Sequence, residues 1–194
     1  MPKQRDGKIL VPFSPECDAS GVKRQLLPKE YLWYFRTIQL PKIPAGKRLL
    51  LQFGAVDQDA VIYCNGKRAG GHLGGYLSFS VDLTPYLKTG ENELAVKVRD
   101  ETDTDWKDRG KQSLTPGGMF YTAQSGIWQT VWLERVPENY IQSLTVTPDY
   151  DARTVTVKVH TSAPGGAVNL WAVVRAGGVT IAEDWGSDEA DQDG

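Results

Sequence analysis

Residues Ala60–Leu83 read AVIYCNGKRAGGHLGGYLSFSVDL, and this stretch decides the fold class. Asn65-Gly66 favours a two-residue hairpin turn, because a type I′ turn needs positive φ at both positions. Two glycine pairs, Gly70-Gly71 and Gly74-Gly75, then predict a loop. From Leu77 to Leu83 apolar and polar residues alternate, which is typical of a strand with one buried face. A hairpin, a glycine loop and a strand together predict an all-β fold.

Four other segments before residue 136 also have the character of strands, the first by its aromatic and β-branched residues and the other three by alternation. They are Tyr31–Leu40, Arg48–Phe53, Glu93–Asp100 and Ile127–Arg135, all predicted to be strands. In the last of them, Ile127, Val131 and Leu133 are expected on one face, with Trp128 and Trp132 on the other. These two tryptophans are interpreted as packing residues. Thr84-Pro85 predicts one helical turn over Thr84–Leu87 with Thr84 as its N-cap, because proline suits the first helical position.

Val136-Pro137 predicts a boundary between two units. Beyond it, three strands are predicted at Ile141–Thr147, Thr154–Thr161 and Val168–Arg175, followed by a short strand and an acidic tail, Asp184–Gly194. Three or four strands are too few for an immunoglobulin-like sandwich, which takes about seven. Such a partial sandwich leaves open strand edges and an exposed apolar face. We therefore expect self-association through residues 138–194, or mobility of these residues.

Composition excludes several classes of partner. The net charge of −2 argues against nucleic acid or an anionic membrane. No apolar run approaches the roughly 20 residues of a membrane helix, and the N-terminus, MPKQRDGKIL, lacks the apolar core of a signal peptide. Cys17 and Cys64 are interpreted as two free thiols in a reducing compartment, with a disulfide as the alternative. The expected location is cytoplasmic, with export left open.

Three segments together carry a family resemblance. They are Trp33–Arg36 (WYFR), the block from Gly54 to Val98 that contains the hairpin, and Ser125–Glu134 (SGIWQTVWLE). In this order they resemble the N-terminal sugar-binding domain of glycoside hydrolase family 2, which includes β-galactosidases and β-glucuronidases. The resemblance covers roughly residues 7–135.

The resemblance implies a particular order of domains. Residues 1–136 would be a galactose-binding-like jelly-roll sandwich without the family's usual first strand. Residues 138–194 would be the first part of an immunoglobulin-like linker domain. In the family a catalytic (β/α)8 barrel follows, and this sequence contains no counterpart of it. The expected function is therefore that of a non-catalytic accessory region of a glycosidase. The alternative is a stand-alone carbohydrate-binding, lectin-like module, which needs an exposed aromatic platform.

Catalysis by this chain alone is not expected. Retaining glycoside hydrolysis needs two carboxylates about 5–5.5 Å apart, and the resemblance implies that both are glutamates on barrel strands. The first of these follows an asparagine in the family, which draws attention to Asn92-Glu93. However, Thr89–Asn92 reads as a turn, and Glu93 begins an amphipathic strand on its polar face. The pair is therefore interpreted as structural, and whether the chain belongs to an enzyme stays open.

Substrate contact is the role that remains, because the resemblance implies that loops of this domain reach the mouth of the barrel. In well-known members an aspartate five residues before the SGI motif contacts the sugar, and this chain has Phe120 there. Tyr121 can stack on a sugar ring, and Gln124 offers a donor and an acceptor. The full set of candidates is Glu16, Tyr121, Gln124, Trp106 and Arg109. The structural alternative, that they only order their loops, stays open for each of them.

No metal or cofactor is expected. Asp103, Asp105 and Asp108 suggest calcium, but their spacing lacks the glycine and glutamate of an EF-hand loop, so a solvated acidic loop is favoured. His72 and His160 do not form a zinc pattern. No glycine-rich segment has phosphate-loop spacing followed by a helix. The expected partners are a carbohydrate and a catalytic barrel.

Overall fold

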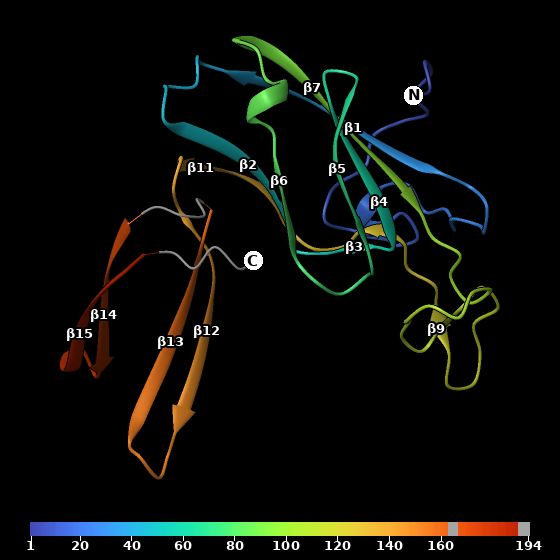
Figure 1. The fold of residues 1–194 in the computed structure, drawn as a ribbon. Coiled ribbons are helices and arrows are strands. Elements are labelled where there is room, and N and C mark those ends of the chain that lie inside the picture. Colours follow the sequence, from blue (N-terminus) through green and yellow to red (C-terminus); the bar gives the residue numbers. More distant parts are fainter. Residues whose placement is uncertain (163–166, 190–194) are drawn as a thin grey trace. The chain divides into compact units, whose positions relative to one another are not determined.

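In a computed structural model, residues 1–162 and 167–189 are described, and the chain divides into two compact units, Met1–Arg135 and Val136–Gly194. The described residues form strands and two single turns of 3-10 helix, η1 (Asp18–Ser20) and η2 (Thr84–Tyr86), as Figure 1 shows. The prediction of an all-β fold is confirmed. Among these residues, the structure has no helix with the length and apolar character needed to cross a membrane.

The first unit contains two main sheets. The larger has the order β1-β7-β4-β5 and is antiparallel throughout: β1 (Leu32–Leu40), β7 (Gly90–Arg99), β4 (Asp59–Cys64) and β5 (Lys67–Leu73). The smaller has the order β11-β2-β6: β11 (Val131–Pro137), β2 (Lys47–Phe53) and β6 (Phe79–Asp82). Two short pairs complete the unit: β3 (Val56–Asp57) with β10 (Gly126–Ile127), and β8 (Gln112–Ser113) with β9 (Tyr121–Thr122).

The hydrophobic core is built from apolar residues of both sheets. Ile62 of β4 and Val98 of β7 belong to the same buried cluster as Phe53 of β2 and Val81 of β6. In β4 the burial alternates strictly along the strand, because successive side chains point to opposite faces. Burying each large apolar side chain contributes about 1.5–3 kcal/mol. The alternation seen in the sequence therefore produces a two-layered sandwich.

The Asn65-Gly66 turn joins β4 to β5, with φ of 50° and 80° at its two positions. The predicted hairpin is confirmed, but the loop predicted at Gly70-Gly71 is wrong, because both glycines lie within β5 and pair with β4. The side-chain amide of Asn65 donates hydrogen bonds through Nδ2 to the Tyr86 carbonyl (2.9 Å) and to Oδ1 of Asn92 (2.8 Å). Asn92 is fully buried and donates to the carbonyls of Lys88 and Gly90. Its side chain thus fixes the turn before β7. The turn predicted over Thr89–Asn92 is wrong in extent, because Gly90, Glu91 and Asn92 already pair with β1 as the start of β7.

The strand predicted at Ile127–Arg135 is wrong as one continuous element. It is split into β10 and β11, which pair with different strands. Between them, the carbonyl of Thr130 accepts a hydrogen bond from the Gly54 amide at 2.9 Å. The Gly54 turn separates β2 from β3, so the chain opposite it must change partners at the same place. Ile127 is buried while Leu133 is exposed, which also contradicts their predicted common face.

The predicted helical turn is present as η2, but its N-cap is Leu83 rather than Thr84. The Thr84 hydroxyl accepts a hydrogen bond from the Leu49 amide of β2 at 2.9 Å, and no side chain caps η2 by a hydrogen bond. Asp82 instead accepts a hydrogen bond from the Thr84 amide at 2.9 Å. A contact between distant segments therefore replaces the local cap.

The described residues of the second unit form two antiparallel hairpins. They are β12 (Ile141–Asp149) with β13 (Thr154–Thr161), and β14 (Ala167–Ala176) with β15 (Val179–Glu189). In the first hairpin Leu144 lies opposite Val159, and Val146 lies opposite Val157, all on one face. The last strand runs to Glu189, so the prediction of a short strand followed by a tail from Asp184 is wrong. Residues 190–194 of that predicted tail lie outside the described residues.

Candidate functional site

The long segment between β7 and β10, residues 101–125, forms an ordered loop that projects from the sheets of the first unit (Figure 1). We call it the 101–125 loop. Its two arms pair in parallel through β8 and β9, and the Tyr121 amide donates to the Lys111 carbonyl at 2.8 Å. A tight turn closes the arms, with hydrogen bonds of 3.1 Å in both directions between Gly117 and Phe120.

The acidic residues of the loop stabilise its turns. Asp103 accepts hydrogen bonds from the Ser113 hydroxyl (2.8 Å) and the Leu114 amide (3.0 Å), which lower the pKa of its carboxyl. Asp105 accepts one from the Trp106 amide at 2.7 Å. Over residues 1–162 and 167–189, no group of three or more histidine, cysteine, aspartate or glutamate side chains is arranged to hold a metal ion.

Four of the five predicted contact residues lie on this loop with their side chains exposed. Trp106 is 92 % exposed and Tyr121 is 73 % exposed. Gln124 is exposed between two fully buried neighbours, Ala123 and Ser125. Arg109 donates through Nη1 to the Asp105 carbonyl at 2.9 Å, so part of its guanidinium serves the loop itself. The structure therefore brings Tyr121 and Gln124 together on one short segment and places Trp106 and Arg109 on the other arm.

Glu16 lies in a different loop, beside η1, and its carboxylate is occupied by protein donors. Oε1 accepts from the Leu26 amide (3.1 Å) and from Nε2 of Gln25 (3.2 Å). Oε2 accepts from the Ser125 amide at 3.1 Å. Burial raises the pKa of the Glu16 carboxyl, and the hydrogen bonds from Leu26 and Ser125 offset part of that rise. Glu16 thus contacts the base of the 101–125 loop.

Two further carboxyls lie near this base, and the sequence patterns did not reveal them. Asp57 of β3 is 8 % exposed, and burial raises its pKa to about 7, with the charges of Asp100 and Glu16 adding to the rise. Asp100, which directly follows β7, is buried and accepts from the Thr102 amide at 2.7 Å. Burial also raises the pKa of Asp100. We call Glu16, Asp57 and Asp100 the carboxyl cluster.

Two glycines make this packing possible. A Cβ at Gly75 would lie 2.5 Å from Oδ1 of Asp57, so only glycine leaves room for the Asp57 carboxyl. At Gly126, in the SGI motif, φ is +77° and the hydroxyl of Tyr34 occupies the place of a Cβ. That hydroxyl accepts a hydrogen bond from the Ile127 amide at 3.1 Å. Both glycines are therefore required by close approach of a polar side chain.

Trp128 and Trp132, interpreted as packing residues, differ in their surroundings. Trp128 donates through Nε1 to the Gly75 carbonyl at 2.8 Å and meets the Tyr76 ring edge-on at 6.3 Å. It therefore links the glycine loop to the residue that directly follows the SGI motif. Trp132 on β11 is 45 % exposed.

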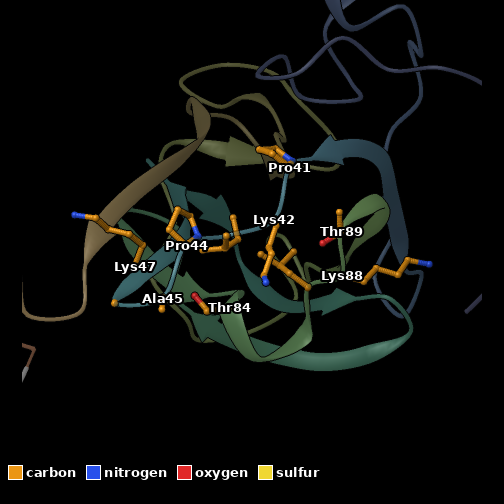
Figure 2. A pocket seen from close by; sticks show the side chains of 11 residues that line it. Pro41, Lys42, Pro44, Ala45, Lys47, Thr84, Lys88 and Thr89 are labelled. Carbon is orange, nitrogen blue, oxygen red and sulfur yellow. The ribbon is translucent and has the colours of Figure 1, made fainter.

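A pocket of about 350 Å³ lies elsewhere on the first unit, between the β1–β2 connection and the end of η2 (Figure 2). Its lining includes Lys42, Lys47 and Lys88, and the amino groups of Lys47 and Lys88 point away from the other lining side chains. None of the predicted sugar-contact residues lines it. The pocket is therefore separate from the 101–125 loop.

Comparison with known proteins identifies a family for the first unit. The family model described as "Glycosyl hydrolases family 2, sugar binding domain" matches residues 24–137. The chain is 37 % identical over 131 residues to a β-galactosidase of Bacteroides ovatus, covering 67 % of this chain and 14 % of that protein. It is 38 % identical over 78 residues to a β-glucuronidase of Formosa agariphila, covering 40 % of this chain and 8 % of that protein.

A solved structure extends the likeness to most of the chain. A β-glucuronidase of Faecalibacterium prausnitzii is 25 % identical with a TM-score of 0.65, and the match covers 95 % of this chain and 35 % of that one. The chain thus spans only a small part of the length of the relatives it matches. Because the family model matches residues 24–137, the chain belongs to glycosyl hydrolases family 2 and contains the family's sugar binding domain.

Proposed function

We propose that this chain is the non-catalytic, sugar-binding region of a longer family 2 glycosidase of the β-galactosidase or β-glucuronidase type. The observation that carries the proposal is the 101–125 loop, which presents Tyr121 and Gln124 to solvent from a base formed by buried Ala123 and Ser125. An exposed pair on a fixed base is suited to binding, because little conformational entropy is lost when the ligand arrives.

Each exposed side chain has a chemical role in this proposal. Tyr121 offers a ring face to the C–H groups of a pyranose, and Gln124 offers both a donor and an acceptor to its hydroxyls. Trp106 provides a second aromatic surface, and Arg109 provides a cation on the same arm. Phe120, 47 % exposed, adds apolar surface at a position where the resemblance implies a carboxylate.

Hydrolysis is assigned to a part of the protein that this chain does not span. The proposed reaction is retaining hydrolysis of an O-glycosidic bond by two glutamates, supplied by a catalytic barrel. The relatives named β-galactosidase and β-glucuronidase are far longer than the matched segment, which supports this division. A cytoplasmic location is part of the proposal, supported by Cys17 and Cys64, which are both free thiols.

A stand-alone carbohydrate-binding module is the second candidate function. The nearly complete exposure of Trp106 favours it, because an exposed indole is a sugar platform that needs no barrel.

The proposal also includes self-association through residues 138–194. It is supported by the exposed apolar face of the β12–β13 hairpin, where Leu144 and Val146 are 55 % and 58 % exposed.

An NMR titration of the isotopically labelled chain tests the sugar contact. The probes are 4-nitrophenyl β-D-galactoside and 4-nitrophenyl β-D-glucuronide, up to millimolar concentration. We expect shifts in the signals of Tyr121, Gln124 and the Trp106 indole, and a weaker response in Gln124→Ala. Gln129→Ala, at another exposed glutamine, is the matched control. Saturable shifts confined to other surfaces, or none with either probe, would rule out sugar contact by this loop in the isolated chain.

A further inference from the structure

Glu16 joins chain segments that are far apart in the sequence. One carboxylate oxygen accepts a hydrogen bond from the Leu26 amide, and the other accepts one from the amide of Ser125, 109 positions away. The same carboxylate also receives Nε2 of Gln25 at 3.2 Å. The loop beside η1, the segment before β1 and the base of the 101–125 loop therefore meet at a single side chain.

This bridge requires a carboxylate. An ionised carboxylate presents two acceptor oxygens, whereas the amide of glutamine presents one oxygen and one NH₂ donor. Glutamine at position 16 can therefore accept from Leu26 or from Ser125, but its NH₂ then faces the other backbone N–H. Hydrogen bonds to charged groups are also the stronger ones. The substitution breaks one end of the bridge while keeping the shape of the side chain.

Through Ser125, the bridge also holds the preceding residue of the loop, Gln124. Ser125 is fully buried, and its amide is the group that Glu16 accepts from. The preceding amide, that of Gln124, donates to Oε1 of Gln112 at 2.9 Å. Gln112 in turn lies opposite Tyr121 in the β8–β9 pair. The backbone of Gln124 is thus held on both sides, by Glu16 through Ser125 and by Gln112.

We propose that Glu16 is a positioning residue, which acts through Ser125 to hold Gln124 and Tyr121 in place for sugar contact and does not itself touch the sugar. The inference rests on the proposed function and refines it. Three protein donors already contact the two oxygens of Glu16, and the side chain is partly buried, which leaves it little acceptor capacity for a sugar hydroxyl.

Glu16→Gln tests the inference, with Glu30→Gln as the matched control. Glu30 also accepts from a backbone amide, that of Leu27 at 2.9 Å, and pairs with Arg24, but all its contacts lie within six residues. We expect amide exchange in Glu16→Gln to accelerate about tenfold or more at Ser125 or Leu26, since a charge-assisted bond is lost. The dissociation constant for whichever aryl glycoside binds the wild type should rise about tenfold. Urea denaturation of both variants checks that they remain folded.

A pH titration of the wild type followed by NMR gives a second readout of the bridge, which does not depend on sugar binding. The amide protons of Ser125 and Leu26 should shift together on acidification, with one midpoint, as Glu16 takes up a proton. Other titratable groups face this site: Asp57 on β3, Asp100 after β7 and Tyr34 on β1, with Lys107 near Asp100. The same experiment on Asp57→Asn identifies the titration of Asp57, and on Asp100→Asn that of Asp100. In Glu16→Gln the shared midpoint should disappear.

The outcomes separate this inference from the proposed function. Absence of a shared midpoint, or exchange in Glu16→Gln equal to that in Glu30→Gln, overturns the bridge itself. A broken bridge with unchanged affinity for the probe overturns the positioning role and leaves sugar contact by the loop standing. No binding of either probe by the wild type counts against both. A broken bridge with weakened binding, in a folded variant, supports the positioning role.

Discussion

Gly126 has the tightest steric requirement near the candidate site. Its φ is +77°, and the Tyr34 hydroxyl fills the space of a Cβ. Gly126→Ala should lower the free energy of unfolding by about 2 kcal/mol or more, because strain and a displaced buried hydroxyl act together. Urea denaturation followed by tryptophan fluorescence measures this loss. Gly117→Ala is the control, since a Cβ there has no neighbour within 4 Å. Equal stability of the two variants would contradict the explanation.

Asp57 makes the stability of the first unit depend on pH. Its folded pKa, about 7, lies above the ordinary value of 3.8. The folded state therefore keeps the proton over a range in which the unfolded state has lost it. The contribution is favourable at low pH and is lost as the pH rises from about 4 to about 7, by at most about 4 kcal/mol.

Asp57→Asn should reduce this pH dependence, because asparagine does not titrate. Denaturation midpoints at pH 5 and pH 8 measure the effect, and Asp59→Asn, on neighbouring β4, is the control. The wild type should lose stability between these pH values by more than Asp57→Asn does. Asp100 and Glu16 also have raised pKa values, so some pH dependence should survive the substitution. An identical pH dependence in both proteins would show that Asp57 does not titrate as proposed.

Among the elements, those set by local patterns could be predicted from the sequence. The Asn65-Gly66 turn follows from turn chemistry, β2 and β7 follow from alternation, and β1 follows from its aromatic and β-branched residues. The break between β10 and β11 could not be predicted, because it depends on pairing with a turn at Gly54, more than 70 residues earlier. The predicted N-cap of η2 was wrong because of another long-range contact: the Thr84 hydroxyl accepts a hydrogen bond from the Leu49 amide of β2.

The buried amide of Asn92 connects three elements: the β4–β5 turn, the end of η2 and the start of β7. Asn92→Asp keeps the size of the side chain but removes the donor to the carbonyls of Lys88 and Gly90. It should lower the free energy of unfolding by about 2–4 kcal/mol, through lost hydrogen bonds and a buried charge. Thermal denaturation of this variant beside Asn139→Asp, at an exposed asparagine, measures the difference. A loss no larger than in the control would contradict the structural role.

At the scale of the whole molecule, the candidate site was predicted only in part. Tyr121, Gln124, Trp106 and Arg109 share one loop, as their proximity in sequence indicated, and their contact with sugar stays a prediction. Glu16 could be selected as a candidate, but its bond to Ser125 spans 109 positions and has no local signal. Asp57 and Asp100 meet only because β3 and β7 belong to neighbouring parts of the sandwich.

The β12–β13 hairpin allows a test of association by the second unit. Val146→Lys places a charge on the exposed apolar face and should shift the chain toward monomer in analytical ultracentrifugation. Thr147→Lys, on the opposite face of the same strand, is the control and should leave association unchanged. A wild type that is already monomeric at high concentration would contradict self-association through residues 138–194.

The proposed function makes this chain the sugar-binding region of a longer family 2 glycosidase. The most direct test is the length of the native product, from its intact mass in the source or from the reading frame beyond the codon for Gly194. We expect several hundred further residues that include a catalytic barrel with two glutamates. A stop codon directly after Gly194 would contradict it and would favour the stand-alone carbohydrate-binding module.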